Sequence, residues 1–203
     1  AQELRYSGYR ELSREIKAYV RERVTAPSTQ VNEAEAPNEV LAGLINYADQ
    51  TMRQFVTSEL ESVAKAVDVL AEAERIWLTG EYTYYDLASF LTKKFQTYGQ
   101  DAHVFQPSIV ETSRALTQMH EGDALLAFAG ADASLDTGYA VRLADKKGLN
   151  TVAVVGSGVI LPAREAQTTI TVPQQSPAGV SAFGVLFQVT SLIWEAVIVE
   201  REP

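Results

Sequence analysis

The sequence predicts a three-layer α/β/α sandwich with a five-stranded parallel sheet, preceded by a helical N-terminal segment. Short apolar or β-branched runs alternate with stretches of helical spacing. The runs are RIWLT (75–79), AHVFQ (102–106), ALLAFA (124–129), TVAVV (151–155) and TTITV (168–172). Strands that are apolar on both faces suit a parallel sheet covered by helices on each side. With 203 residues and 46% hydrophobic content, the chain is long enough for one good core.

The first segment, residues 1–26, predicts a charged helix with a narrow apolar stripe. Four apolar residues recur at intervals of four, namely Leu12, Ile16, Val20 and Val24. Such a helix needs a partner. Residues 27–38 contain Pro27 and Pro37 and almost no large apolar side chain, so we interpret them as a linker. The remaining residues, 39–203, form the predicted α/β domain.

This domain is predicted to begin with a long amphipathic helix and to end with an apolar one. The entry helix has three-and-four spacing at Met52, Phe55, Val56, Leu60, Val63, Val67 and Leu70. The closing segment, 181–200, is apolar nearly all round, so it should be buried inside the domain or against another subunit. We therefore expect a dimer or a higher oligomer.

Composition excludes several classes of function. The chain has no cysteine and only two histidines, which argues against a metal centre, and nothing predicts a cofactor. Residues 1–26 carry six Lys/Arg and four Glu, or +2, so the rest carries 11 basic and 22 acidic residues, or −11. The acidic part would repel a nucleic-acid backbone. No apolar run approaches the length of a membrane span, and the first residues lack a signal-peptide core, so we expect a cytoplasmic protein without a membrane partner.

Candidate ligand-binding loops follow three of the strands, because open parallel sheets bind ligands at the carboxyl ends of their strands. These loops are GEYTYYD (80–86), AGADASLD (129–136) and VGSGVILP (155–162). The first has the strand, glycine, helix order of a phosphate cradle, but it is filled with tyrosine.

Two segments together carry a resemblance to a known family. The spacing from Gly80 to Ala88, the segment GDALLAFAGADASLDTGYAVRLADKKG (122–148) and the long entry helix resemble the sugar isomerase (SIS) domain of RpiR-type transcriptional regulators. Upstream, YSGYRELSREIKAYVRERV is similar to the end of the helix-turn-helix domain that precedes it. The resemblance implies that residues 1–26 are the remnant of a DNA-binding domain, and that DNA is bound only through a complete one.

The family's phosphosugar loops are altered here. They read approximately G-x-G-x-S and S-x-S-G-x-T in the family, so the resemblance places their second glycine at Tyr82 and their first serine at Tyr84. In the second loop the serines fall on Ala129 and Ala131 and the glycine falls on Asp132. Loss of hydroxyl donors and gain of a carboxylate disfavour a phosphate. Aromatic faces and acceptors favour a neutral sugar or an amine-bearing or nucleoside-like molecule.

We therefore predict a ligand-sensing and dimerisation domain whose small-molecule effector is a sugar or a sugar derivative. The predicted binding residues are Gly80, Tyr82, Thr83, Tyr84, Gly130, Asp132, Ser134 and Ser157. Other interpretations remain open. The tyrosines, Tyr85 above all, would then pack beneath a loop or at a subunit contact, or would plug the site that holds a phosphosugar in the family. Asp132 and Asp136 would cap the helix that follows them, and the glycines around Ser157 would form an ordinary turn.

The alternative from another class is a sugar-phosphate isomerase. Moving a proton between adjacent carbons needs a positioned base, and the candidate bases are His103, Glu111 and Glu121. Both anchor loops are degraded, and in the second loop only Ser134 keeps a hydroxyl group, so we predict no catalytic residues. For His103 and His120 a structural role is favoured.

Overall fold

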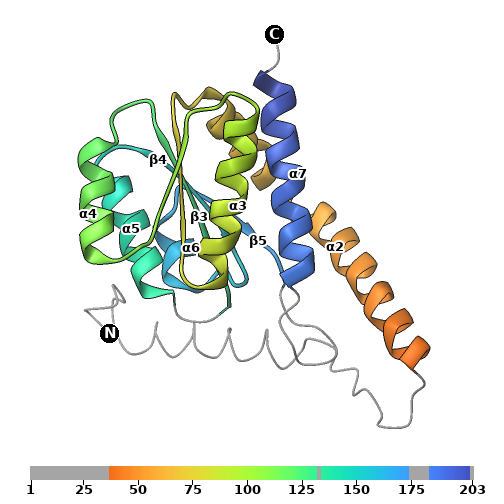
Figure 1. The fold of residues 1–203 in the computed structure, drawn as a ribbon. Coiled ribbons are helices and arrows are strands. Elements are labelled where there is room, and N and C mark those ends of the chain that lie inside the picture. Colours follow the sequence, from red (N-terminus) through yellow and green to blue (C-terminus); the bar gives the residue numbers. More distant parts are fainter. Residues whose placement is uncertain (1–36, 132–133, 174–182, 202–203) are drawn as a thin grey trace. The chain divides into compact units, whose positions relative to one another are not determined.

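Five parallel strands form one sheet in the order β2-β1-β3-β4-β5 (Figure 1). The computed structural model describes residues 37–131, 134–173 and 183–201. The strands are β1 (Ile76–Gly80), β2 (Ala102–Phe105), β3 (Ala124–Ala129), β4 (Asn150–Val155) and β5 (Thr168–Thr171). Each predicted strand is confirmed to within one residue at either end. Residues 1–26 and most of the predicted linker lie outside the described residues.

Helices cover both faces of the sheet (Figure 1). One face is covered by α3 (Thr83–Thr97) and α7 (Phe183–Arg201). The other is covered by α4 (Ile109–Gln118), α5 (Leu135–Lys146) and α6 (Leu161–Glu165). The predicted α/β/α class is thereby confirmed.

The entry helix α2 (Pro37–Glu72) crosses the boundary between two compact units. Of the first unit, the described residues are 37–50, where Leu41 and Ile45 are exposed. The second unit begins at Thr51 and contains the whole sheet. Within it, α2 buries Phe55, Val67 and Leu70 of the predicted stripe. Val56 and Leu60 of that stripe are exposed.

The core has two halves because alternate residues of a strand face opposite sides of the sheet. Leu125 and Ala127 of β3 belong to a cluster with Trp77 and residues of α4 and α5. Leu126 and Phe128 face the other way, toward Leu91, Phe95, Ile193 and Trp194 of α3 and α7. Burial on both faces explains why the strands lack polar alternation.

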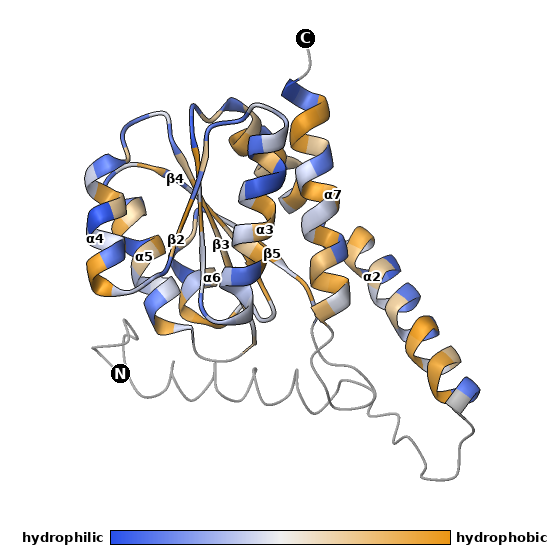
Figure 2. Cartoon of the chain, viewed as in Figure 1, coloured by the Kyte–Doolittle hydropathy of each residue, from blue (hydrophilic) through white to orange (hydrophobic). Residues whose placement is uncertain are grey.

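Helix α7 accounts for the apolar closing segment (Figure 2). Its buried residues are Val185, Leu186, Val189, Thr190, Ile193, Trp194, Val197 and Ile198. It is long and apolar enough to span a membrane, so the expectation that no run reaches such a length is wrong for this helix. It packs against α3 and the sheet through these buried residues, whereas Phe187, Leu192 and Val199 are exposed.

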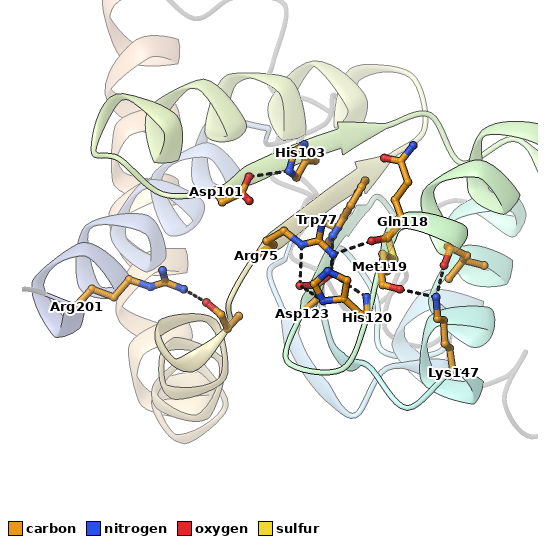
Figure 3. A network of polar contacts seen from close by, with 12 residues as sticks. Arg75, Trp77, Asp101, His103, Gln118, Met119, His120, Asp123, Lys147 and Arg201 are labelled. Carbon is orange, nitrogen blue, oxygen red and sulfur yellow. Dashed lines mark hydrogen bonds and ion pairs between the residues drawn. The ribbon is translucent and has the colours of Figure 1, made fainter.

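A buried carboxylate joins the two central strands at their amino ends (Figure 3). Asp123, directly before β3, is fully buried. Its two oxygens accept hydrogen bonds from Arg75 Nε at 3.0 Å and Arg75 Nη2 at 2.8 Å. Trp77 Nε1 and the His120 amide donate to the same carboxylate, each at 3.1 Å. Arg75 also donates to the carbonyl of Gln118 at 2.7 Å, which ties the end of α4 to the network.

These donors keep Asp123 ionised. Burial alone would raise its pKa, but the hydrogen bonds from Arg75, the His120 amide and Trp77 lower the pKa below its usual value. The same pairing raises the pKa of Arg75, chiefly through its hydrogen bond to Asp123. The folded state therefore holds a charged pair whose partners are satisfied.

Replacing Asp123 by alanine should lower the free energy of unfolding by about 3 to 5 kcal/mol, because it leaves the Trp77 donor buried without a partner and Arg75 without its carboxylate. Urea unfolding of the variant, with the exposed Asp68→Asn as control, measures this loss. Because the pKa of Asp123 is lowered on folding, its contribution is complete above about pH 4 and is lost as the pH falls through the folded-state pKa. An Asp123→Ala variant as stable as Asp68→Asn at pH 7 would contradict the assignment.

Candidate functional site

The loops after β1 and β3 meet, because these strands are neighbours in the sheet. Gly80, the last residue of β1, is in register with Phe128 of β3. Gly80 is buried, and a Cβ built on it would lie 2.8 Å from both the Cβ and the carbonyl carbon of Tyr84. The first turn of α3 therefore folds closely over the end of β1, and only glycine fits there.

Tyr84 crosses from the β1–α3 loop to the end of β3. A Cβ built on Gly130 would lie 2.3 Å from the Tyr84 hydroxyl oxygen, so Gly130 leaves room for this hydroxyl. The Tyr84 ring also lies 6.0 Å from the ring of Phe183, centroid to centroid. Tyr84 is half-buried. Of the predicted binding residues, Gly80, Tyr84 and Gly130 are thus brought together.

Two amides at the start of α3 donate to carbonyl groups of the same turn. The amide of Tyr84 donates to the carbonyl of Glu81 at 3.0 Å, and the amide of Tyr85 donates to the carbonyl of Tyr82 at 2.9 Å. These two amides are therefore used within the first turn of α3. Tyr82 itself has a positive φ of 54°, which is a strained conformation for a non-glycine residue.

Glu81 reaches across to the amino end of α5. Its Oε2 accepts a hydrogen bond from the Thr137 amide at 3.2 Å and another from Thr137 Oγ1 at 3.0 Å. Ser134 is the N-cap residue of α5, but its side chain makes no capping hydrogen bond. The negative carboxylate lies at the positive end of the helix dipole, where an anion is stabilised. A carboxylate from the neighbouring loop therefore caps α5.

The remaining predicted residues are exposed, are buried in a turn, or lie outside the described residues. The side chain of Tyr82 is 87% exposed, and Thr83, the first residue of α3, is exposed. Ser157 is buried in the turn after β4, where its hydroxyl accepts a long hydrogen bond of 3.5 Å from the Val159 amide. Asp132 lies outside the described residues.

The candidate bases of an isomerase are not gathered at this edge. His103 lies on β2, where its Nε2 is 2.7 Å from Asp101 Oδ1 and its ring stacks on Trp77. Glu111 forms an ion pair with Arg114. Glu121 precedes β3, so it lies at the amino end of that strand, opposite to the edge where the loops meet.

His103 and Glu111 instead line a groove along the edge strand β2, between α3 and α4. Its volume is about 510 Å³, and Tyr85, Lys93 and Arg114 also line it. Tyr85 therefore faces this groove. Among residues 37–131, 134–173 and 183–201, no three His, Asp or Glu side chains are grouped so that they could hold a metal ion.

Comparison with known proteins identifies the fold. No protein-family model and no curated protein matches the sequence. The sugar isomerase domain of the RpiR transcription factor from Sphaerobacter thermophilus matches with a TM-score of 0.71 and 21% identity, over 81% of this chain and 90% of that one. The fold is that of a sugar isomerase (SIS) domain.

Two further SIS-fold structures are similar. The NanR protein of Vibrio vulnificus, complexed with ManNAc-6P, matches with a TM-score of 0.66 and 15% identity, over 97% of this chain and 69% of that one. A protein of Bacteroides fragilis, described as a phosphosugar isomerase involved in capsule formation, matches with a TM-score of 0.62 and 18% identity, over 82% and 90%. The fold is thus shared by regulators and isomerases.

Glutamate 81 is the residue of the site that sequence reasoning missed. It occupies the variable position between Gly80 and Tyr82, so the family pattern gave it no role. The sequence did contain a signal, because Glu81 directly follows the glycine that ends β1. Since β1 and β3 are neighbours, this position lies beside the start of the helix that follows β3. Its partner, Thr137, is 56 residues away, and only the fold brings the two together.

Replacing Gly130 by alanine should destabilise the protein by about 1 to 3 kcal/mol, because the new methyl group would overlap the Tyr84 hydroxyl. In a Tyr84→Ala background the same change should cost much less. A double-mutant cycle by urea unfolding measures this coupling. Gly158→Ala is the control, since a Cβ there would lie 3.6 Å from its nearest neighbour. Additive effects of the Gly130 and Tyr84 changes would show that the two do not touch.

Proposed function

We propose that this chain is the ligand-sensing and dimerisation domain of an RpiR-type transcriptional regulator, and that its effector is a sugar or sugar derivative without a phosphate. The observation that carries the proposal is the arrangement at the carboxyl ends of β1 and β3. There Tyr84 lies over Gly130, and Glu81 caps α5. An aromatic face beside a carboxylate can stack on a sugar ring and accept hydrogen bonds from its hydroxyl groups.

The same arrangement argues against an isomerase. Proton transfer requires a base within hydrogen-bonding reach of the substrate, together with an anchor that aligns it. His103 and Glu111 line a different groove and are paired with Asp101 and Arg114, respectively. The alternative of an SIS-fold enzyme is therefore the weaker candidate.

Regulation of transcription would require a DNA-binding domain in the same protein as this ligand-sensing domain. The family resemblance of residues 1–26 supports a preceding helix-turn-helix domain, which would bind DNA in the cytoplasm. Residues 27–203 carry a net charge of −11, so the sensor itself would repel duplex DNA. Ligand and operator would then be coupled through the oligomer.

The ligand class can be tested by isothermal titration calorimetry against a panel of sugars, amino sugars and nucleosides, each with and without a phosphate. Unphosphorylated members should bind more tightly. Tyr84→Ala and Ser134→Ala should each weaken that binding about tenfold, the effect of losing about 1.4 kcal/mol of contact. Tighter binding of the phosphorylated members, lost in the same variants, would contradict the proposal. Binding of no member would favour a dimerisation module whose pocket is plugged by Tyr84.

Light scattering should give at least twice the monomer mass of 22.2 kDa at micromolar concentration. Phe90 of α3 and Phe187 of α7 form an aromatic pair with ring centroids 5.1 Å apart, and both remain about 40% exposed. Introducing charge there with Phe187→Glu should shift the protein toward the monomer, whereas Leu143→Glu on the exposed side of α5 should not. A wild-type mass of one chain would contradict self-association.

A further inference from the structure

We infer that Glu81 determines the ligand class of this site: its carboxylate holds the place that a ligand's phosphate would need, so the site takes ligands that donate hydrogen bonds. This inference rests on the proposed function, because it presumes a small-molecule site at the carboxyl ends of β1 and β3. It assigns the preference against phosphate to one residue.

The geometry places a negative charge where an incoming anion would be stabilised. Helix α5 has 12 residues, so its dipole is developed, and the Thr137 amide belongs to its first turn. That amide and the Thr137 hydroxyl both donate to Glu81 Oε2. Thr137 is fully buried, and Glu81 is half-buried. The carboxylate thus already uses donors that a phosphate would require.

The position of this carboxylate is fixed by its own backbone. The Glu81 carbonyl accepts the Tyr84 amide, so the residue is held by the first turn of α3 while its side chain crosses to α5. The preceding Gly80 has no side chain, which allows that turn to fold onto the strand end. Glu81 therefore connects the two loops as a fixed element of the site.

A phosphate would also meet unfavourable charge. It carries between one and two negative charges, and it would approach both Glu81 and Asp136, which lies in the first turn of α5. A hydroxyl or an ammonium group is favoured beside a carboxylate, because it donates hydrogen bonds. Oε1 of Glu81 accepts no hydrogen bond from the described residues, so it can receive such a donor.

Inorganic phosphate is the probe that tests this inference, because it needs no knowledge of the natural effector. The full chain, labelled with nitrogen-15, is titrated with phosphate while the Thr137 amide is followed by NMR. Wild type and the control Asp86→Asn, an exposed acid in the first turn of α3, should show no saturable shift. Glu81→Ala should show one, with affinity for phosphate at least tenfold higher than that of wild type. Glu81→Gln should gain less, because its amide oxygen still accepts from Thr137.

A saturable shift of Thr137 in the wild-type protein would overturn the inference, and this arm requires no variant to fold. A folded Glu81→Ala or Glu81→Gln variant that gains no phosphate affinity would overturn it as well. The outcome is separate from that of the ligand panel. A phosphate gain in Glu81→Ala with no ligand found would leave the role of Glu81 intact and remove the sensing function. If a neutral ligand is found but Glu81→Ala gains no affinity for phosphate, the sensing function is kept and the role of Glu81 is removed.

Discussion

The buried carboxylate of Asp123 fixes the central pair of strands on which the candidate site depends. It binds Arg75 and Trp77 at the start of β1 and lies itself at the start of β3, so it sets how the two strands align at their amino ends. In a parallel sheet, this alignment also decides where the opposite ends lie. Gly80 and Phe128 fall in register there, and the loops after them come within reach of each other. A charge paired at one end of the sheet thus supports the geometry of the loops at the other.

Those loops close on each other through two side chains from the same segment. Tyr84 occupies the space left by Gly130, and Glu81 accepts hydrogen bonds from Thr137. The NanR relative is described in complex with a phosphorylated sugar, so the SIS fold can serve a phosphate-bearing ligand. In this chain a carboxylate and a tyrosine stand at the carboxyl ends of β1 and β3. Because one fold can carry different loops, we propose that loop residues set the ligand class of this chain.

The sequence was sufficient for the fold because every strand is a distinct apolar run bounded by helical spacing. It also placed Gly80, Tyr84 and Gly130 in one site, since neighbouring parallel strands end at the same edge. It could not reveal the pairing of Glu81 with Thr137, because no local pattern links residues so distant in the chain. The positive φ of Tyr82 was equally hidden, since tyrosine rarely adopts it. The apolar pattern of α7 predicted burial inside the domain or against another subunit. Phe187, Leu192 and Val199 are exposed within the described chain, and the apolar pattern alone does not distinguish residues buried in the domain from residues that a second subunit would cover.

The proposed ligand class depends on the amino end of α5 being occupied from within the chain. A crystal structure of the wild-type protein grown at high phosphate concentration tests it most directly, because it shows the occupant of that position. We expect the Glu81 carboxylate to remain within hydrogen-bonding distance of the Thr137 amide and hydroxyl, with no anion beside them. A phosphate bound to the Thr137 amide, with Glu81 turned away into solvent, would contradict it.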